Sequence, residues 1–134
     1  QIIEEVGVHN ALWKLFDEAD YIVGQNSNAF DIKWCNSKFV YYKLPPPSEY
    51  KKIDTKLEAK RYLKLPSYSL DYIADYFGLG RKITHEGFIL WKKCIAGDRR
   101  AWVRMKRYNA HDVNLLYKVF LKLKPFTQQL RSII

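Results

Sequence analysis

Cysteine is scarce in this sequence: Cys35 and Cys94 are the only two among 134 residues. They stand far apart in unrelated surroundings, and no Cys-x-x-Cys pair or Cys/His cluster accompanies them. The sequence therefore offers no zinc site of the usual kind and no disulfide framework. A reduced, cytoplasmic setting is the simplest expectation for such a chain.

Long apolar runs are absent as well. No stretch approaches the roughly 18 apolar residues that span a membrane, so we expect no membrane partner. The first residues, QIIEEVGVHNALW, lack the basic-then-apolar layout of a signal peptide. Internal repeats and low-complexity tracts are missing too. What is present is the length of one domain and an apolar content of 48%, which is enough for a core.

Positive charge dominates, but only in the second part of the chain. The net charge is +9 at pH 7. Residues 1–50 carry four basic and seven acidic side chains, whereas residues 51–134 carry nineteen basic and seven acidic ones. A basic surface of this size attracts polyanions, of which nucleic acid is the usual one. Aromatic residues make up 16% of the chain, and they pack cores or stack on bases.

The hydrophobic pattern predicts a mostly helical chain with two short strands, one at 21–24 and one within 51–55. Helices are expected at 5–19, 29–44, 55–63, after the capping residue Ser69, at 88–95, and from the cap Asp98 to about Leu123. The apolar residues expected to face the core are Val8, Leu12, Leu15, Phe16 and Ala19 in the first helix, and Phe30, Trp34 and Val40 in the second. Two strands alone do not make a viable α/β sheet. Either the domain is mostly helical, or the rest of the sheet lies outside this sequence. We favour the second interpretation and expect an α/β fold whose remaining strands lie outside this sequence.

One group of polar residues stands where the first strand gives way to a helix, in GQNSNAFD (24–31). Asp31 falls in the first turn of that helix, near the carboxyl end of the strand. Active sites of open α/β sheets lie at that edge. The alternative is that Asn28 or Asp31 merely caps the helix.

A second group lies in the last long helix, in YNAHD (108–112). The i, i+4 spacing puts Tyr108 and Asp112 on one face. That face continues through apolar residues: Met105, Leu115, Val119 and Leu123. An ionised Asp on such a stripe is costly unless it is paired or binds a metal. The alternative is that Tyr108 is plain core and Asp112 faces outward.

Together the two groups resemble the second and third motifs of the ribonuclease-H-like, DEDD-type 3′–5′ exonucleases. The resemblance covers roughly residues 10 to 126. The segment KKIDTKLEAKRYLKLPSYSLDYIADYFGLGRK is similar to the one between these motifs in predicted phage and bacterial exonucleases. The following GFILWKKCIAGDRRAWVRMKRYNAHDV is similar as well, with its Phe-x-x-Trp and Gly-Asp-x-x-Ala-Trp patterns.

The resemblance implies roles for individual residues. Asp31 matches the metal-binding aspartate of the second motif, and Asp112 matches that of the third. Tyr108 takes the tyrosine place of the Tyr-type subclass, where it orients the attacking water. The His-type subclass needs a His where this chain has Arg107, and the side chain of His111 is expected to point elsewhere on the helix.

Two further acidic residues match recurrent positions of the family outside its four catalytic carboxylates. They are Asp54 and Asp71, which are weaker candidates for a direct role. For Asp54 the alternative is a cap on the helix that begins at Thr55. For Asp71 it is a first-turn residue that complements the helix dipole.

The family's first motif, Asp-x-Glu on the first strand, does not occur in this sequence. The resemblance therefore implies that residues 1–134 form a single domain that is the C-terminal part of an exonuclease domain, mostly helical and lacking the first three strands. The Asp-x-Glu pair would come from a preceding segment or from a second chain. We expect the 134 residues alone to bind the catalytic metal weakly and to cleave poorly.

The chemistry implied by the resemblance is two-metal hydrolysis of phosphodiester bonds, with Mg²⁺ or Mn²⁺ as cofactor. The expected substrate is a single-stranded 3′ end, of DNA in the first instance. Polar and basic residues expected to contact it are Asn26, Asn28, Lys56, Lys60, Arg61, Arg81 and Lys82, with Arg99 and Arg100 as further candidates.

Two other functions are compatible with the sequence. One is a nucleic-acid-binding module that keeps the basic face without catalysis, and it predicts salt-sensitive binding without turnover. The other is a helical interaction domain, whose aromatic residues form a core and whose charge serves solubility. That domain predicts a stable fold without affinity for nucleic acid.

Overall fold

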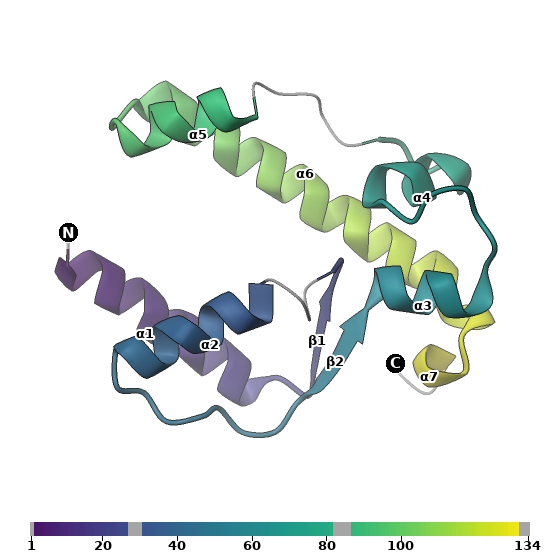
Figure 1. Cartoon of the computed structure of the whole chain (residues 1–134), viewed down its shortest axis with the longest axis horizontal. Helices are drawn as coiled ribbons and strands as arrows, with labels where there is room; N and C mark the ends of the chain where they lie inside the picture. Colours follow the sequence, from purple (N-terminus) through teal and green to yellow (C-terminus); the bar gives the residue numbers. More distant parts are fainter. Residues whose placement is uncertain (1, 27–30, 82–86, 132–134) are drawn as a thin grey trace. The chain divides into compact units, whose positions relative to one another are not determined.

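A computed structural model of the chain describes residues 2–26, 31–81 and 87–131, apart from the side chains of residues 2–6 and 31. The chain divides into two compact units, residues 1–58 and 59–134. Figure 1 shows the elements in chain order. They are α1 (Ile2–Glu18), β1 (Tyr21–Gly24), α2 (Asp31–Tyr41), β2 (Lys51–Asp54), α3 (Thr55–Tyr62), α4 (Leu70–Tyr76), α5 (Phe88–Ile95), α6 (Arg99–Leu123), the 3-10 turn η1 (Lys124–Phe126) and α7 (Gln128–Arg131).

This order of elements confirms the predicted fold class, an α/β fold that is mostly helical with two strands. The predicted helices are all present, and their ends differ from expectation by a few residues. The final short helix, α7, is not predicted by the sequence. A helix of four residues is too short to produce a helical period, and its one buried side chain is Leu130.

The two strands pair in parallel, with Tyr21 opposite Lys51 and Gly24 opposite Asp54. The chain crosses from one strand to the next through α2 and the extended segment 44–50. Because the strands are parallel, their carboxyl ends meet at the same edge of the sheet. Gly24 and Asp54 both lie at that edge, and both are buried.

The proline-containing segment between α2 and β2 is fastened to α1 by side-chain hydrogen bonds. The Trp13 indole N–H donates to the carbonyl of Pro45 at 2.7 Å. The Asp17 carboxylate accepts from both the backbone N–H and the hydroxyl of Ser48, each at 2.8 Å. These two donors lower the pKa of Asp17. The segment thus approaches β2 along a fixed path, although three prolines give it no helical or sheet pairing of its own.

The core of the first unit differs from the one predicted for α1. Phe16 is buried and Leu12 and Ala19 are half-buried, as expected, but Val8 and Leu15 are exposed. Another buried residue of α1 is His9, whose ring lies 5.1 Å from that of Tyr42 and 5.7 Å from that of Trp34. The prediction was wrong because apolar residues occupy two faces of this helix. His9 and Phe16 share one face at i, i+7, whereas Val8 and Leu15 share another.

The predicted inner face of α2 was also wrong. Trp34 and Val40 are exposed, whereas Ile32 and Phe39 are buried. The third residue expected inside, Phe30, lies outside the described residues. Ile32 and Phe39 again share a face at i, i+7, and the Phe39 ring packs edge-on against Phe16 at 5.5 Å. That aromatic contact joins α1 to α2.

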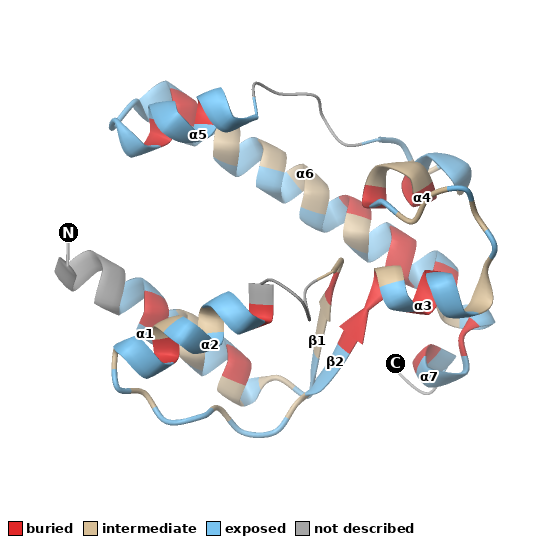
Figure 2. Cartoon of the chain, in the orientation of Figure 1, coloured by how far each residue is buried: buried red, intermediate tan, exposed pale blue. Residues whose placement is uncertain are grey.

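The second unit is organised along α6. Figure 2 shows buried residues along this helix and on the helices that pack against it, α4 and α5. The buried side chains of α6 are Ala101, Leu115, Val119, Phe120 and Leu123. They are met by Ile73 and Ala74 of α4 and by Leu90 and Cys94 of α5.

The turn between α5 and α6 depends on two neighbouring residues. Gly97 has φ +91°, a conformation that other residues rarely adopt. The Asp98 carboxylate accepts from the backbone N–H groups of Arg100 and Ala101 at 3.0 and 3.1 Å, so Asp98 is the predicted cap of α6. The predicted cap Ser69 is likewise present at the start of α4, where it accepts from Tyr72.

Candidate functional site

At the carboxyl ends of the two strands, Asp54 holds the adjoining backbone. One of its carboxylate oxygens accepts from the N–H of Asn26 at 2.8 Å and from the N–H of Lys56 at 3.0 Å. The contact with Lys56 makes Asp54 the cap of α3, which was the structural alternative for this residue. The contact with Asn26 ties the loop after β1 to the end of β2.

The neighbouring residue, Thr55, strengthens the same connection. Its hydroxyl is fully buried and lies 3.1 Å from the carbonyl of Gly24 and within hydrogen-bonding distance of the Gln25 amide oxygen. Asn26 has φ +59°, a left-handed conformation that Asn tolerates better than most residues. The strand ends therefore form a fixed platform on which the polar loop after β1 begins.

We predict that Asp54→Asn destabilises the chain by about 2 kcal/mol or more. Asp54 is only 4% exposed, and its charge strengthens two backbone hydrogen bonds that the neutral amide would weaken. Urea denaturation gives the change in the free energy of unfolding. Asp20→Asn is the matched control, because Asp20 is exposed at the other end of the sheet, and a change within about 0.5 kcal/mol is expected there. Equal stability of the two variants would contradict this role for Asp54.

The second-motif residues stand directly after this platform. Asp31 is the first residue of α2, which follows β1, so its backbone lies in the predicted helical turn. The side chain of Asp31 and the whole of Asn28 lie outside the described residues. The predicted ligand and contact roles of these two residues therefore stay predictions.

The third-motif residues lie on α6, one turn apart. Tyr108 is half-buried, and its ring packs with Met105 against Leu90, Cys94 and Ala101. Packing on this side fixes the ring and therefore the region that the hydroxyl can reach.

Asp112 is also half-buried. It stands one turn after Tyr108 and three residues before the buried Leu115, and the buried stripe continues through Val119 and Leu123. Tyr108 and Asp112 thus share the side of α6 that the apolar pattern predicts. Because Asp112 is half-buried, it remains in partial contact with solvent.

The histidine beside Asp112 has a different task. The Nε2 atom of His111 lies 2.7 Å from the carbonyl oxygen of Arg81. Since a carbonyl only accepts, the ring N–H donates, and His111 tethers the segment after α4 to α6. This contact agrees with the expectation that His111 points away from the direction of Asp112.

Asp71 and Arg81 belong to a small charged group at α4. Asp71 lies in the first turn of this helix, which agrees with the alternative interpretation that it complements the helix dipole. Arg81 forms an ion pair with Asp75 at 2.9 Å, and this hydrogen bond lowers the pKa of Asp75 and raises that of Arg81. The charge of Asp71 raises the pKa of Arg81 further. Arg81 is therefore partly neutralised by its own neighbours, which weakens the case for a phosphate contact.

The remaining basic candidates lie on or near α3. Lys56 is half-buried, and both Lys60 and Arg61 are exposed. The Lys60 ammonium lies 5.9 Å from the centre of the Tyr68 ring. Lys82 lies outside the described residues. The exposure of Lys60 and Arg61 is compatible with a phosphate contact, and it is equally compatible with an ordinary solvated surface charge.

A divalent cation of the Mg²⁺ type needs several oxygen ligands. Among the residues whose side chains are described, no three or more His, Cys, Asp or Glu residues group together in a way that suits a metal ion. The described residues therefore offer single carboxylates, of which Asp112 is the one predicted as a ligand. The donor set fits such an ion only in company with ligands outside the described part.

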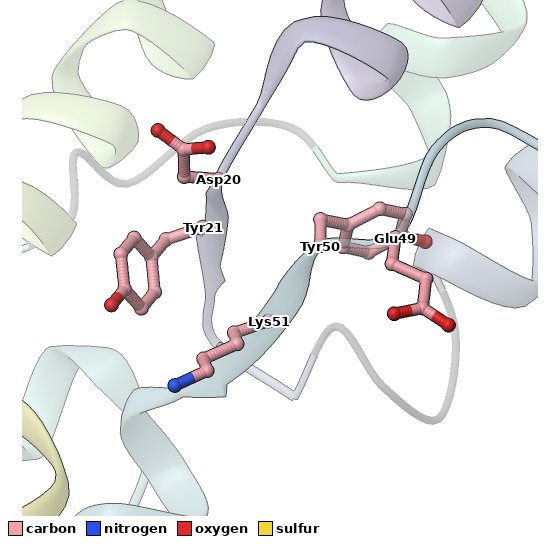
Figure 3. A pocket seen from close by; sticks show the side chains of 5 residues that line it. All are labelled: Asp20, Tyr21, Glu49, Tyr50 and Lys51. Atoms are coloured by element: carbon pink, nitrogen blue, oxygen red, sulfur yellow. The ribbon is translucent and has the colours of Figure 1, made fainter.

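A shallow hollow that the sequence did not predict lies at the opposite, amino-terminal end of the strands. It has a volume of about 500 Å³ and is lined by Asp20, Tyr21, Glu49, Tyr50 and Lys51. Figure 3 shows the Lys51 side chain reaching toward Tyr21 from the neighbouring strand, and the two are 5.8 Å apart from ammonium to ring centre. An acidic residue and a tyrosine precede or open each strand, and this repeated pattern is the signal that sequence reasoning missed.

Two parallel strands, each followed by a helix, define an α/β protein. The chain belongs to the RNase H superfamily, whose family model matches residues 2–124. Members of this superfamily are in general nucleases, and they typically use divalent metal ions. No curated protein and no solved structure matches the chain. None of the described helices is both long enough and apolar enough to cross a membrane.

Proposed function

We propose that this chain carries the second and third motifs of a metal-dependent 3′–5′ exonuclease of the Tyr-type DEDD group, similar to those of phage and bacteria. The observation that carries the proposal is on α6. There Tyr108 and Asp112 lie one turn apart and are both half-buried, on the helix face that also carries the buried Leu115 and Val119. Membership of the RNase H superfamily supports hydrolysis of nucleic acid as the reaction class.

In this proposal Asp31 and Asp112 are ligands for Mg²⁺ or Mn²⁺. When bound, a pair of such ions stabilises the charge that develops on the attacking and leaving oxygens of the phosphodiester. The carboxylate of Asp112 is held in direction by α6, whose buried side is fixed by Leu115 and Val119. A ligand on a packed helix loses little freedom when it binds.

Tyr108 is the positioning residue. Its ring is held by Leu90, Cys94 and Ala101, so the phenol O–H has a restricted range. From there the hydroxyl orients the attacking water by a hydrogen bond. A binding module without catalysis would explain the packing of the Tyr108 ring, but it gives no task to the half-buried carboxylate of Asp112.

The proposal includes an Asp-x-Glu pair that the 134 residues do not contain. A preceding segment of a longer protein or a second chain would supply it. The substrate is a single-stranded 3′ end, with DNA preferred in the first instance, and the location is the cytoplasm. Residues 1–134 alone should then bind catalytic metal weakly.

The test uses the protein expressed from its complete reading frame. Single-stranded DNA and RNA oligonucleotides labelled at the 5′ end are incubated with Mg²⁺ or Mn²⁺, with EDTA as control. The proposal predicts a ladder of labelled products that shorten one nucleotide at a time from the 3′ end, and no cleavage in EDTA. A single internal cut, degradation from the 5′ end, or binding without any cleavage would overturn it.

The same assay on residues 1–134 tests the Asp-x-Glu part separately. Cleavage far below that of the complete protein is expected. Equal rates from both would show that these residues complete the site by themselves.

A further inference from the structure

The α5–α6 hairpin, residues 87–107, exposes an apolar surface that the proposed reaction does not use. On α5 the side chains of Leu90 and Cys94 are buried against Ala101. On the other side of the same helix, Phe88 is 69% exposed, Trp91 47% and Ile95 70%. These three residues stand at i, i+3 and i+7 and form one stripe. Figure 2 shows how much of α5 is exposed around its narrow buried face.

The hairpin that carries this α5 stripe (Phe88, Trp91 and Ile95) is strongly basic. Residues 87–107 contain seven basic side chains and one acidic one, a formal charge of +6. The basic residues are Lys92, Lys93, Arg99, Arg100, Arg104, Lys106 and Arg107. The one acid, Asp98, is the cap of α6, so its charge is directed at backbone N–H groups. The positive charge therefore favours a polyanion as the ligand of this surface.

Two details favour a strand of nucleic acid among the polyanions. The Lys92 ammonium lies 5.0 Å from the centre of the exposed Phe88 ring, which places a cation for a phosphate beside a ring for a base. Trp91 adds a second exposed aromatic face one turn further on the same stripe. Alternating rings and cations are the usual design of single-strand binding surfaces.

We infer that the α5 stripe binds single-stranded nucleic acid, with bases stacked on Phe88 and Trp91 and phosphates on Lys92 and Lys93. The choice of nucleic acid rests on the proposed function. The contact is independent of metal and of Asp112, so this surface adds affinity for the strand rather than chemistry. It also gives a role to the Phe-x-x-Trp pattern, which the proposed reaction leaves without one.

The test measures binding of a fluorescein-labelled, single-stranded 12-nucleotide DNA by anisotropy in EDTA, so that cleavage plays no part. Trp91→Ala should weaken binding about tenfold, because one stacked base contributes roughly that much. Replacing Lys92 and Lys93 by Ala should make the negative slope of log K against log salt shallower by about 1.4. All the changed side chains are exposed, so thermal unfolding should remain as in the wild-type chain.

Tyr117 and Lys118 are the matched control. They are an exposed aromatic residue and a neighbouring lysine on α6, outside the hairpin. Replacing both by Ala should leave binding within about twofold of wild type. Equal losses in the two sets of variants would overturn the inference, because any exposed ring and lysine would then serve.

A second arm uses vesicles of phosphatidylcholine with phosphatidylserine. If Trp91→Ala abolishes vesicle binding and leaves DNA binding unchanged, the surface docks on an anionic membrane and the inference is wrong. The proposed function fails separately. Stripe-dependent DNA binding without metal-dependent cleavage refutes the exonuclease alone, and cleavage by a protein whose Trp91→Ala variant binds normally refutes the stripe alone.

Discussion

Asp112→Asn should lower the rate of metal-dependent hydrolysis by about a thousandfold in the protein expressed from its complete reading frame. A carboxylate ligand helps to hold ions that supply several kcal/mol of charge stabilisation, and each 1.36 kcal/mol is a factor of ten in rate. Asn keeps the size of the side chain, so the half-buried position is not distorted. The measurement is the initial rate of nucleotide release at saturating Mg²⁺.

The matched control is Asp75→Asn, in the same unit of the chain. Asp75 is exposed and its partner is Arg81, so its loss should leave the rate within about twofold. Thermal unfolding of both variants excludes a general loss of structure. A rate for Asp112→Asn above half of the wild-type rate would show that Asp112 is not a ligand of the catalytic metal.

Tyr108→Phe should lower kcat by about 10- to 100-fold and leave KM and metal affinity unchanged. The ring still packs against Leu90, Cys94 and Ala101, so only the hydroxyl is lost. A hydrogen bond that forms to a charged or developing nucleophile contributes about 1.5–3 kcal/mol, which corresponds to that range of rates.

The separation of kcat from KM distinguishes positioning from a structural role, because a damaged helix would change both. Tyr117→Phe is the control on the same helix. Its ring is exposed, and its hydroxyl has no task in the proposed site, so both constants should stay as in wild type. An equal loss in both variants would contradict the role of Tyr108.

Local signals made much of the fold predictable. Ser69 and Asp98 are the caps of α4 and α6, as predicted. Capping is recognisable in a sequence because the side-chain oxygen bonds a backbone N–H only two or three residues further along the chain. The apolar run at 21–24 and the Lys51–Asp54 segment gave both strands. Helix α6 and its buried stripe were predictable because the apolar residues recur at helical spacing without interruption.

Other features depend on contacts between residues far apart in the sequence. The cap formed by Asp54 was predictable, but its second bond, to Asn26, joins positions 28 residues apart and left no local trace. The inner faces of α1 and α2 were mistaken because apolar side chains occupy more than one face of each. Burial was decided by the aromatic contact between Phe16 and Phe39, which only the packed structure reveals.

The central claim is that Asp31 and Asp112 are ligands of the catalytic metal, and paramagnetic broadening by Mn²⁺ tests it most directly. The ¹⁵N–¹H spectrum of the protein expressed from its complete reading frame is recorded while Mn²⁺ is added in small steps. We expect the amides next to Asp31 and Asp112 to broaden first and together, and the Asp112→Asn variant to lose both effects. Broadening confined to exposed acids such as Glu49 and Asp75, with the amides at Asp31 and Asp112 unaffected, would contradict the account.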